Sequence, residues 1–217
     1  MSDTYYVAIL LALVGGYLDA YTYLCRGQVF ANAQTGNIVY LGIKAAAGEW
    51  HAMLYYLFPI LAFFAGILFA EMIKRHFRFH PKIHWRQIII LIEFLTLAAV
   101  AFIPQGEFNM AANIMISFVC SLQVESFRKV NDIPYATTMC TGNLRSATEH
   151  LYLYHQTKDK TALKNSLQYY GVILFFIAGA GLGALLTGQW QEKSVLVSGG
   201  ILFFVFLMMF IKEDIEI

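Results

Sequence analysis

The sequence predicts an all-α membrane protein with six transmembrane helices and two re-entrant half-helices, built as two inverted structural repeats. Three observations lead to this prediction. Of the 217 residues, 59% are hydrophobic and only 13% are charged, whereas soluble domains carry about 25% charged residues. Apolar runs long enough to cross a bilayer recur along the chain. The triplet Thr-Gly-Asn occurs twice, each time in a less apolar segment.

The six predicted spans are separated by short connections. Each has about 17 to 21 residues, which is enough to cross or nearly cross a hydrocarbon core of about 30 Å. The spans are Tyr5–Leu24, Met53–Met72, Gln87–Ile103, Phe108–Ser126, Leu167–Thr187 and Val195–Ile211. The only long polar connection is Lys74–Arg86. Because no room is left for a soluble domain, we expect residues 1–217 to form a single membrane domain.

Composition also limits cofactors and partners. The cysteines Cys25, Cys120 and Cys140 lie in or beside apolar segments and have no CxxC spacing, so we read them as packing residues. The N-terminus lacks the basic region and cleavage site of a signal peptide and reads as the start of a permanent first helix. We expect no cofactor, no metal site and no nucleic-acid partner, and membrane lipids and a small-molecule solute as partners.

An internal repeat relates the two halves of the chain. The triplet Thr35–Asn37 recurs as Thr141–Asn143, a shift of 106 residues, and the same shift moves Asp19 onto Glu125. The shift also places Gly15 on a serine, so that a small residue lies one helical turn before each acid. We therefore predict repeat one at about 1–105 and repeat two at about 106–217.

Small residues in the third helix of each half predict close helix packing. Phe-Phe-Ala-Gly ending at Gly66 is echoed by Phe-Phe-Ile-Ala-Gly ending at Gly179, and each glycine has a small residue four positions later. This small-xxx-small spacing lets helix backbones approach closely. The same patterns offer contact faces for a homo-oligomer.

Basic residues give the orientation. They crowd the Lys74–Arg86 loop, including Lys82, so this loop should be cytoplasmic. If the Thr-Gly-Asn segments do not cross, the Lys158–Lys164 cluster and Lys212 are cytoplasmic as well, and both termini lie inside the cell. If they do cross, the chain has eight crossings with parallel halves and a weaker charge bias. This alternative stays open, although the first model fits the basic residues better.

Segment lengths support the model without extra crossings. From Arg26 to Thr35 the chain extends at most about 30 Å, which reaches the bilayer middle. A helix from Thr35 to Glu49 rises about 21 Å, which returns to the surface from there. The second half has nearly the same spacing. Each triplet therefore reads as the start of a half-helix that enters the membrane and returns, the first from outside and the second from the cytoplasm.

Polar residues at these starts are the predicted solute-binding site. Backbone that is not helical at membrane depth must be buried in protein or line a wet cavity. Threonine or asparagine can cap the free N–H groups, and a helix N-terminus attracts an anion or a carbonyl-bearing solute. The predicted substrate-binding residues are Asp19, Gln34, Thr35, Gly36, Asn37, Glu125, Thr141, Gly142, Asn143 and Arg145.

Charged side chains predicted inside the membrane have functional and structural readings. Asp19 and Glu125 suit proton coupling or cation binding, because buried carboxyl groups tend to hold a proton; alternatively they fix the fold by bonding to a half-helix start. Arg145 attracts an anionic substrate or pairs with Glu125, or it extends to the cytoplasmic surface. Glu93 has no acidic repeat counterpart, and we expect it to be structural.

The motifs also point to a family. "GGYLDAYTYL" and "VFANAQTGNIVYLG", followed about a hundred residues later by "SLQVESFRKV" and "ATTMCTGNL", resemble the YoaK-type family of bacterial integral membrane proteins, a domain-of-unknown-function group. The similarity covers essentially the whole chain. The resemblance implies a multi-pass protein of the bacterial cytoplasmic (inner) membrane. It supplies no activity.

The leading functional hypothesis is a transporter or channel for a small polar or anionic solute that is coupled to protons through the buried acids. Its site lies between the two Thr-Gly-Asn starts. A membrane-embedded enzyme acting on a lipid-like substrate is the first alternative. However, the chain lacks a Walker loop, a nucleophile elbow and HExxH, so nothing requires catalysis. The second alternative is a structural or sensory membrane subunit without transport.

Overall fold

The structure is almost entirely helical, which confirms the predicted fold class at that level. The computed structural model describes residues 4–78, 83–131 and 133–210; Lys82, Ile211 and Lys212 lie outside the described residues. The elements are α1 (Tyr5–Cys25), α2 (Gln34–Ala46), α3 (Trp50–Phe77), α4 (Trp85–Val100), α5 (Asn109–Ser126), β1 (Lys129–Val130), β2 (Ile133–Pro134), α6 (Cys140–Thr157), α7 (Lys160–Trp190), the 3-10 helix η1 (Gln191–Ser194) and α8 (Val195–Met208).

Both triplets mark the start of a helix, as predicted. α2 begins at Gln34 and α6 begins at Cys140, one residue before the threonine of each triplet. The segments that lead to these helices are not helical. Residues 26–33 follow α1, and residues 127–131 and 133–139 follow α5 and include the small antiparallel pair of β1 with β2.

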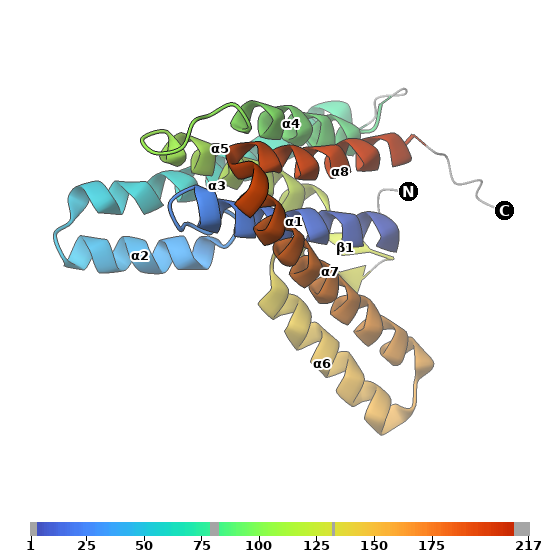
Figure 1. The fold of residues 1–217 in the computed structure, drawn as a ribbon. Coiled ribbons are helices and arrows are strands. Elements are labelled where there is room, and N and C mark those ends of the chain that lie inside the picture. Colours follow the sequence, from blue (N-terminus) through green and yellow to red (C-terminus); the bar gives the residue numbers. More distant parts are fainter. Residues whose placement is uncertain (1–3, 79–82, 132, 211–217) are drawn as a thin grey trace.

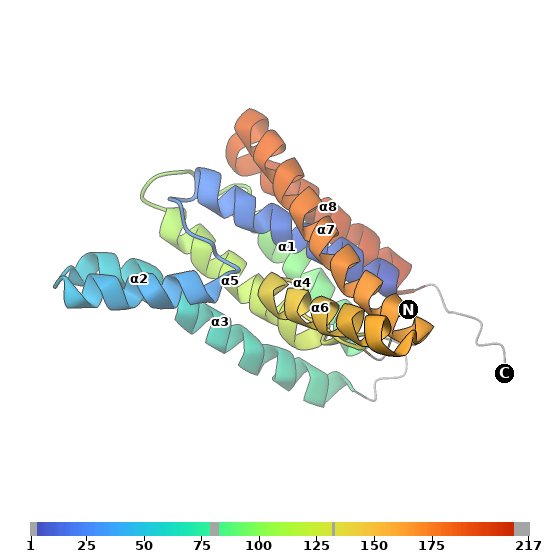
Figure 2. The same ribbon diagram turned by 90° about the horizontal axis from the view of Figure 1, so that it is seen from below.

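Helices of one half pack mainly on helices of the other. α1 lies along α7, α3 lies along α5, and α4 packs against α8, while α2 lies on α3 and α6 lies on α7 (Figures 1 and 2). If α1, α2, α3 and α4 are exchanged in order with α5, α6, α7 and α8, the same pairs of helices result. The pattern is the one expected for two related halves, and the inverted repeat itself stays a prediction.

Glycines make the two main crossings possible. A Cβ atom on Gly179 of α7 would overlap the carbonyl oxygen of Leu13 on α1 and lie only 2.7 Å from the carbonyl carbon. A Cβ atom on Gly66 of α3 would lie 2.8 Å from the backbone oxygen of Phe118 on α5. These glycines are helix-packing residues, as predicted. Because they face their own chain, they are not available for a homo-oligomer, which stays a prediction without this support.

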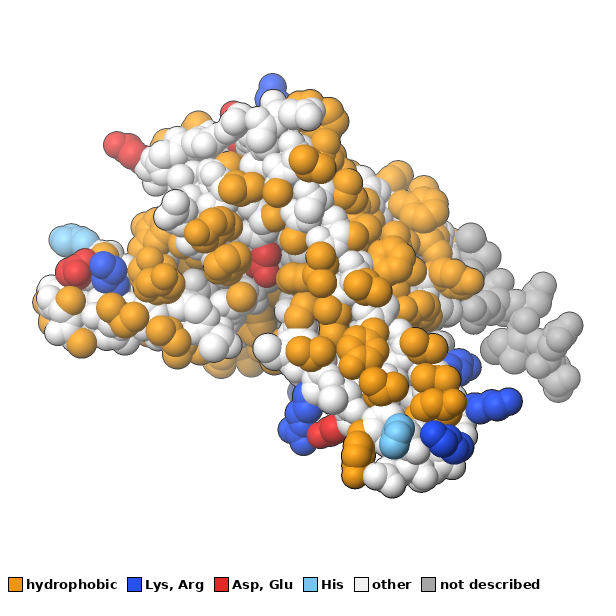
Figure 3. All heavy atoms as spheres, turned by 60° about the horizontal axis from the view of Figure 1, so that its bottom comes forward, with side chains coloured by type: hydrophobic (Ala, Val, Ile, Leu, Met, Phe, Trp, Pro, Cys, Tyr) orange, Lys and Arg blue, Asp and Glu red, His pale blue; other side chains and the backbone are white. Residues whose placement is uncertain are grey.

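The two helical hairpins project toward opposite ends of the molecule. The tip of the α6–α7 hairpin lies at the end where α1 begins and α8 ends, and the tip of the α2–α3 hairpin lies at the other end (Figure 1). Charged side chains gather at these tips, and the surface between them is mostly apolar (Figure 3). This distribution suits a protein whose middle faces lipid.

Three helical segments are long and apolar enough to span a membrane, judged by length and composition. They are Tyr5–Cys25, Trp50–Phe77 and Lys160–Met208, the last of which joins α7, η1 and α8. α4 has 16 residues and α8 has 14, whereas a full span needs about 20. The six predicted spans are therefore not all established, and six stays a prediction.

A fully buried arginine ties the end of α1 to the end of α4. The guanidinium of Arg26 donates twice to the hydroxyl of Tyr21 and also to the backbone oxygens of Val100, Ile103 and Pro104, at 2.7 to 3.3 Å. A positive charge at the last carbonyl groups of a helix is favourable. Arg26 therefore fixes where the chain turns inward after α1.

Candidate functional site

The two non-helical segments meet α1 at its middle. Asn32 on the first segment donates its side-chain Nδ2 to the carbonyl oxygen of Gly15 at 2.9 Å, and its backbone N–H donates to the Asp19 carboxylate at 3.2 Å. Thr138 on the second segment lies so close to Gly15 that a Cβ atom there would be 2.7 Å from its methyl carbon. Gly15 is the eleventh of the 21 residues of α1. Both segments therefore reach the central level of this helix.

One side chain of α5 contacts both segments. The thiol of Cys120 donates to the backbone oxygen of Asn32 at 3.8 Å and lies 3.7 Å from the hydroxyl oxygen of Thr138. Asn32 and Thr138 are themselves related by the 106-residue shift. The thiols of Cys120 and Cys140 both interact electrostatically with Asp19. We call this group of Gly15, Asp19, Asn32, Cys120 and Thr138 the meeting point.

The asparagine of each triplet ties its helix to the segment before it. Asn37 donates to the backbone oxygen of Phe30 at 3.4 Å, and Asn143 donates to that of Ala136 at 2.6 Å, in each case seven residues earlier. The Asn143 side-chain oxygen also accepts from the backbone N–H of Ala136 at 3.3 Å. These bonds are equivalent under the 106-residue shift, so the triplets serve the same structural role in both halves.

Neither half-helix has a side-chain cap, so the expected threonine or asparagine cap is wrong. The residues before the first turns are Ala33 and Met139, and neither makes a capping bond. The two asparagines bond backward instead, because the preceding segment folds over the helix start and offers its carbonyl groups. Gln34 likewise donates to the backbone oxygen of Ala31 at 2.7 Å and accepts from Asn37 at 3.0 Å. The first N–H groups of each helix therefore receive no capping side chain.

The remaining triplet residues are more exposed. The side chains of Thr35 and Thr141 face outward from the helix starts, Gly142 is exposed, and Gly36 is half-buried. Arg145 is also exposed, and its Nε donates to the carboxylate of Glu149 at 2.8 Å. The structure therefore brings Asp19 and the segments together and leaves Arg145 at the surface.

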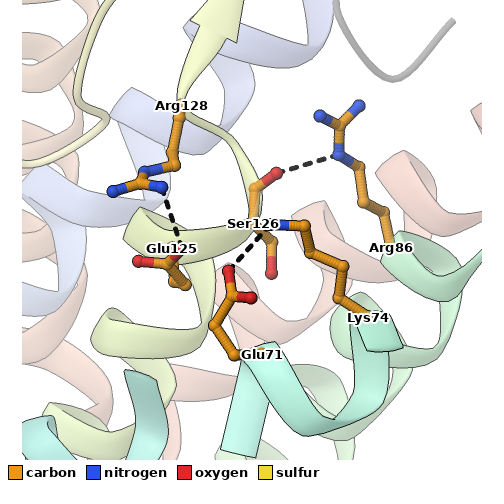
Figure 4. Close-up of polar contacts among 6 residues, drawn as sticks. All are labelled: Glu71, Lys74, Arg86, Glu125, Ser126 and Arg128. Carbon is orange, nitrogen blue, oxygen red and sulfur yellow. Dashed lines mark hydrogen bonds and ion pairs between the residues drawn. The ribbon is translucent and has the colours of Figure 1, made fainter. Parts of the chain in front are cut away.

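Glu125 occupies a different setting from Asp19. It lies in the last turn of α5, where its carboxylate is 3.2 Å from Arg128 and interacts with Glu71 of α3 (Figure 4). Glu71 in turn pairs with Lys74 at 2.7 Å. α1 continues for six residues after Asp19, whereas α5 ends one residue after Glu125. The repeat therefore places the second acid near a helix end, in an ion-pair cluster.

Several residues of the meeting point were not chosen from the sequence. Asn32 and Cys120 have no motif of their own, and only the 106-residue shift from Asn32 to Thr138 hints at a shared role.

Glu93 of α4 was expected to be structural. It is fully buried, and neither carboxylate oxygen has a hydrogen-bond partner among the described residues. Like Asp19, it acts electrostatically on Cys120.

The meeting point is enclosed. Asp19 is 8% exposed, Asn32 is 6% exposed and Cys120 is 2% exposed. Two surface hollows of about 490 and 550 Å³ lie elsewhere, beside Lys160 at the start of α7 and beside Arg75 on α3. Residues of the meeting point line neither hollow. Because these residues are buried, a solute reaches the Asp19 carboxylate only if the segments move.

Comparison with known proteins places the chain in a family. A family model described as "Protein of unknown function (DUF1275)" matches residues 7–208. The chain belongs to the DUF1275 family. The UPF0700 transmembrane protein YoaK of Bacillus subtilis (strain 168) is 25% identical over 197 residues, which cover 87% of this chain and 86% of that protein. No solved structure matches the chain.

The YoaK-type resemblance read from the motifs is confirmed, and the chain is a membrane protein of the DUF1275 family. The matched range includes both non-helical segments, α2, α6 and every residue of the meeting point. The site therefore lies within the part of the chain that the DUF1275 model describes.

Proposed function

We propose that this protein transports a small polar solute across the bacterial cytoplasmic membrane through a site at the meeting point. One observation carries the proposal: two non-helical segments that follow α1 and α5 reach the centre of α1 beside a buried carboxylate. Non-helical backbone at membrane depth must be buried in protein or line a wet cavity, and an acid at that depth usually marks a path for ions or substrates.

The lengths of the half-helices support re-entry in place of crossing. α2 has 13 residues and is about 20 Å long, which is too short for a hydrocarbon core of about 30 Å. It begins at the level of Gly15 and ends at its own hairpin tip, and α6 leaves the same level toward the other end (Figure 1). Half-helices that start near the midplane from opposite sides are typical of inverted-repeat transporters.

Transport then follows from alternating exposure of the meeting point. In the enclosed state the Asn32 N–H binds the Asp19 carboxylate. Movement of the α2–α3 hairpin would open the site toward one side, and movement of the α6–α7 hairpin would open it toward the other. A solute that competes for the Asn32 N–H changes how strongly the carboxyl holds a proton. Solute movement is thereby linked to a proton.

Uptake into proteoliposomes tests the transport proposal. A panel of small anions, cations and neutral solutes is offered with and without a pH gradient. We expect one solute class to accumulate, and Asp19→Asn to keep solute exchange while losing the dependence of net uptake on the gradient. Glu149→Gln, which changes an exposed acid paired with Arg145, is the control. If no solute enters, or if Asp19→Asn leaves the gradient dependence intact, the mechanism is wrong.

Cysteine labelling tests six spans with both termini inside the cell. In a variant without the three native cysteines, Ala47→Cys lies in the exposed α2–α3 turn and Lys160→Cys lies at the exposed start of α7. We expect an impermeant thiol reagent added to intact cells to label Ala47→Cys only. Outside labelling of Lys160→Cys would favour eight crossings.

A further inference from the structure

Two buried side-chain oxygen atoms, one in the meeting point and one on the residue before Thr138, lack hydrogen-bond partners among the described residues. The side-chain oxygen of Asn32 and the hydroxyl oxygen of Thr137 are buried without a partner among the described residues. Asn32 is 6% exposed and Thr137 is fully buried. Buried polar atoms are normally paired, and each unpaired one costs stability. A ligand that these oxygens bind would remove that cost.

Both unpaired oxygens belong to residues that contact the same point on α1. Asn32 bonds to the carbonyl oxygen of Gly15, and the backbone oxygen of Thr137 lies 3.5 Å from the position of a Cβ atom on Gly15. Asp19 follows Gly15 by one helical turn, and the one hydrogen bond described for its carboxylate comes from the Asn32 N–H. One carboxylate and two residues with unpaired side-chain oxygens thus lie beside a single turn of helix.

No basic side chain is described as interacting with this carboxylate. The interactions that affect Asp19 are burial and the Asn32 N–H. The nearby arginines are engaged elsewhere: Arg26 bonds to Tyr21 and to carbonyl oxygens, and Arg145 pairs with Glu149. The buried acid Glu93 also lacks a described basic partner and acts on Cys120 from α4. The middle of the described structure therefore carries acids without compensating positive charge.

We infer that the meeting point binds a small monovalent cation, of the alkali-metal or ammonium type. Carboxylate, amide and hydroxyl oxygens are the ligands that hard cations prefer, and ammonium groups donate to the same atoms. One carboxylate at the site neutralises one positive charge. The N-termini of α2 and α6 favour anions, but this effect is confined to the first turn of each helix, and the hydrogen bond described for the Asp19 carboxylate comes from Asn32, before α2 begins. The inference rests on the proposed transport site and names the charge of its solute.

Thermal unfolding of the purified protein in mild detergent tests the inference. Sodium, potassium and ammonium chlorides are compared at constant ionic strength, with the bulky cation N-methyl-D-glucamine as the filler. We expect at least one small cation to raise the unfolding midpoint saturably, because a ligand that binds only the folded state stabilises it. Asp19→Asn should abolish the rise.

Thr137→Val supplies a second variant that does not depend on the folding of Asp19→Asn. Its hydroxyl has no partner, so its removal should leave the midpoint in N-methyl-D-glucamine unchanged or higher. The apparent cation affinity should fall at least tenfold. Thr161→Val makes the same chemical change at an exposed threonine near the start of α7 and should keep the wild-type affinity.

Three results would overturn the inference. They are a midpoint that no small cation raises above the N-methyl-D-glucamine value, a cation effect that survives in Asp19→Asn and Thr137→Val, and a saturable rise produced by nitrate or phosphate in place of the cations. The outcomes also separate the two proposals. A cation-dependent rise without uptake in liposomes would support the cation site and contradict transport. Uptake of an anion without that rise would support transport and contradict the cation site.

Discussion

The close crossing of α1 and α7 makes a sharp prediction for Gly179→Ala. The new methyl group would overlap the Leu13 carbonyl oxygen and lie 2.7 and 2.9 Å from the Leu13 carbonyl carbon and Cα. These are backbone atoms of a buried helix, so no side chain can rotate away and the two helices must separate. Overpacking of this kind costs about 1–3 kcal/mol. Because the neighbouring backbone is rigid, we expect Gly179→Ala to lower the free energy of unfolding by about 3 kcal/mol through overpacking. Alanine favours the helix over glycine by about 1 kcal/mol, which offsets part of this loss.

A net loss of about 2 kcal/mol lowers the unfolding midpoint by roughly 4–8 °C in a chain of this size. A thiol-reactive fluorophore can follow unfolding, because Cys25 and Cys120 are buried in the folded state. Gly181→Ala is the matched control on the same helix, since nothing lies within 4 Å of its Cβ position. It should leave the midpoint unchanged or raise it. Equal midpoints for Gly179→Ala and Gly181→Ala would refute the steric reasoning.

Three further changes test other contacts. Arg26→Leu leaves the Tyr21 hydroxyl and three backbone oxygens at and just after the end of α4 without this donor. Buried acceptors left unsatisfied cost about 1–3 kcal/mol each, so we expect a loss of at least about 3 kcal/mol in the same thermal assay; a loss below about 1 kcal/mol would show that water replaces the guanidinium. Asn143→Asp removes the donor to Ala136 and should speed hydrogen exchange in residues 127–139, while unchanged exchange would mean that the tie does not hold the segment. Glu125→Gln weakens a pair whose arginine side chain is 67% exposed, so thermal unfolding should show a change below about 1 kcal/mol, and a larger loss would make the cluster of Figure 4 a main support of the fold.

Much of the fold could be predicted because apolar length and small polar triplets are local signals. The first span was predicted as Tyr5–Leu24 and is helical from Tyr5 to Cys25. The predicted last span, Val195–Ile211, begins where α8 begins, at Val195. The starts of α2 and α6 followed from the triplets alone. The strand pair of β1 and β2 was missed, since two-residue strands leave no periodic pattern.

The site was predicted only in part, because its decisive contacts join residues far apart in the chain. Asp19 was chosen correctly as a buried acid beside the first segment. Glu125 was chosen as its equivalent, but a shift in sequence does not record that α5 ends one residue later. The bridge from Cys120 to Asn32 and Thr138 depends on how three elements pack, which one sequence cannot give. The roles of all predicted site residues in binding stay predictions.

The pairing of α1 with α7 has a consequence for how the chain enters the membrane. α7 begins at Lys160, which is 135 residues beyond the end of α1 at Cys25. At a synthesis rate of about 5–20 residues per second, α1 waits roughly 7–27 s for its main partner. During that time Asp19, in the middle of α1, faces lipid or the insertion machinery. The Asn32 segment that bonds to its carboxylate is not yet held in place by Cys120 of the second half. Biogenesis of this protein should therefore depend on membrane insertion factors that retain a polar first helix until the last third of the chain emerges.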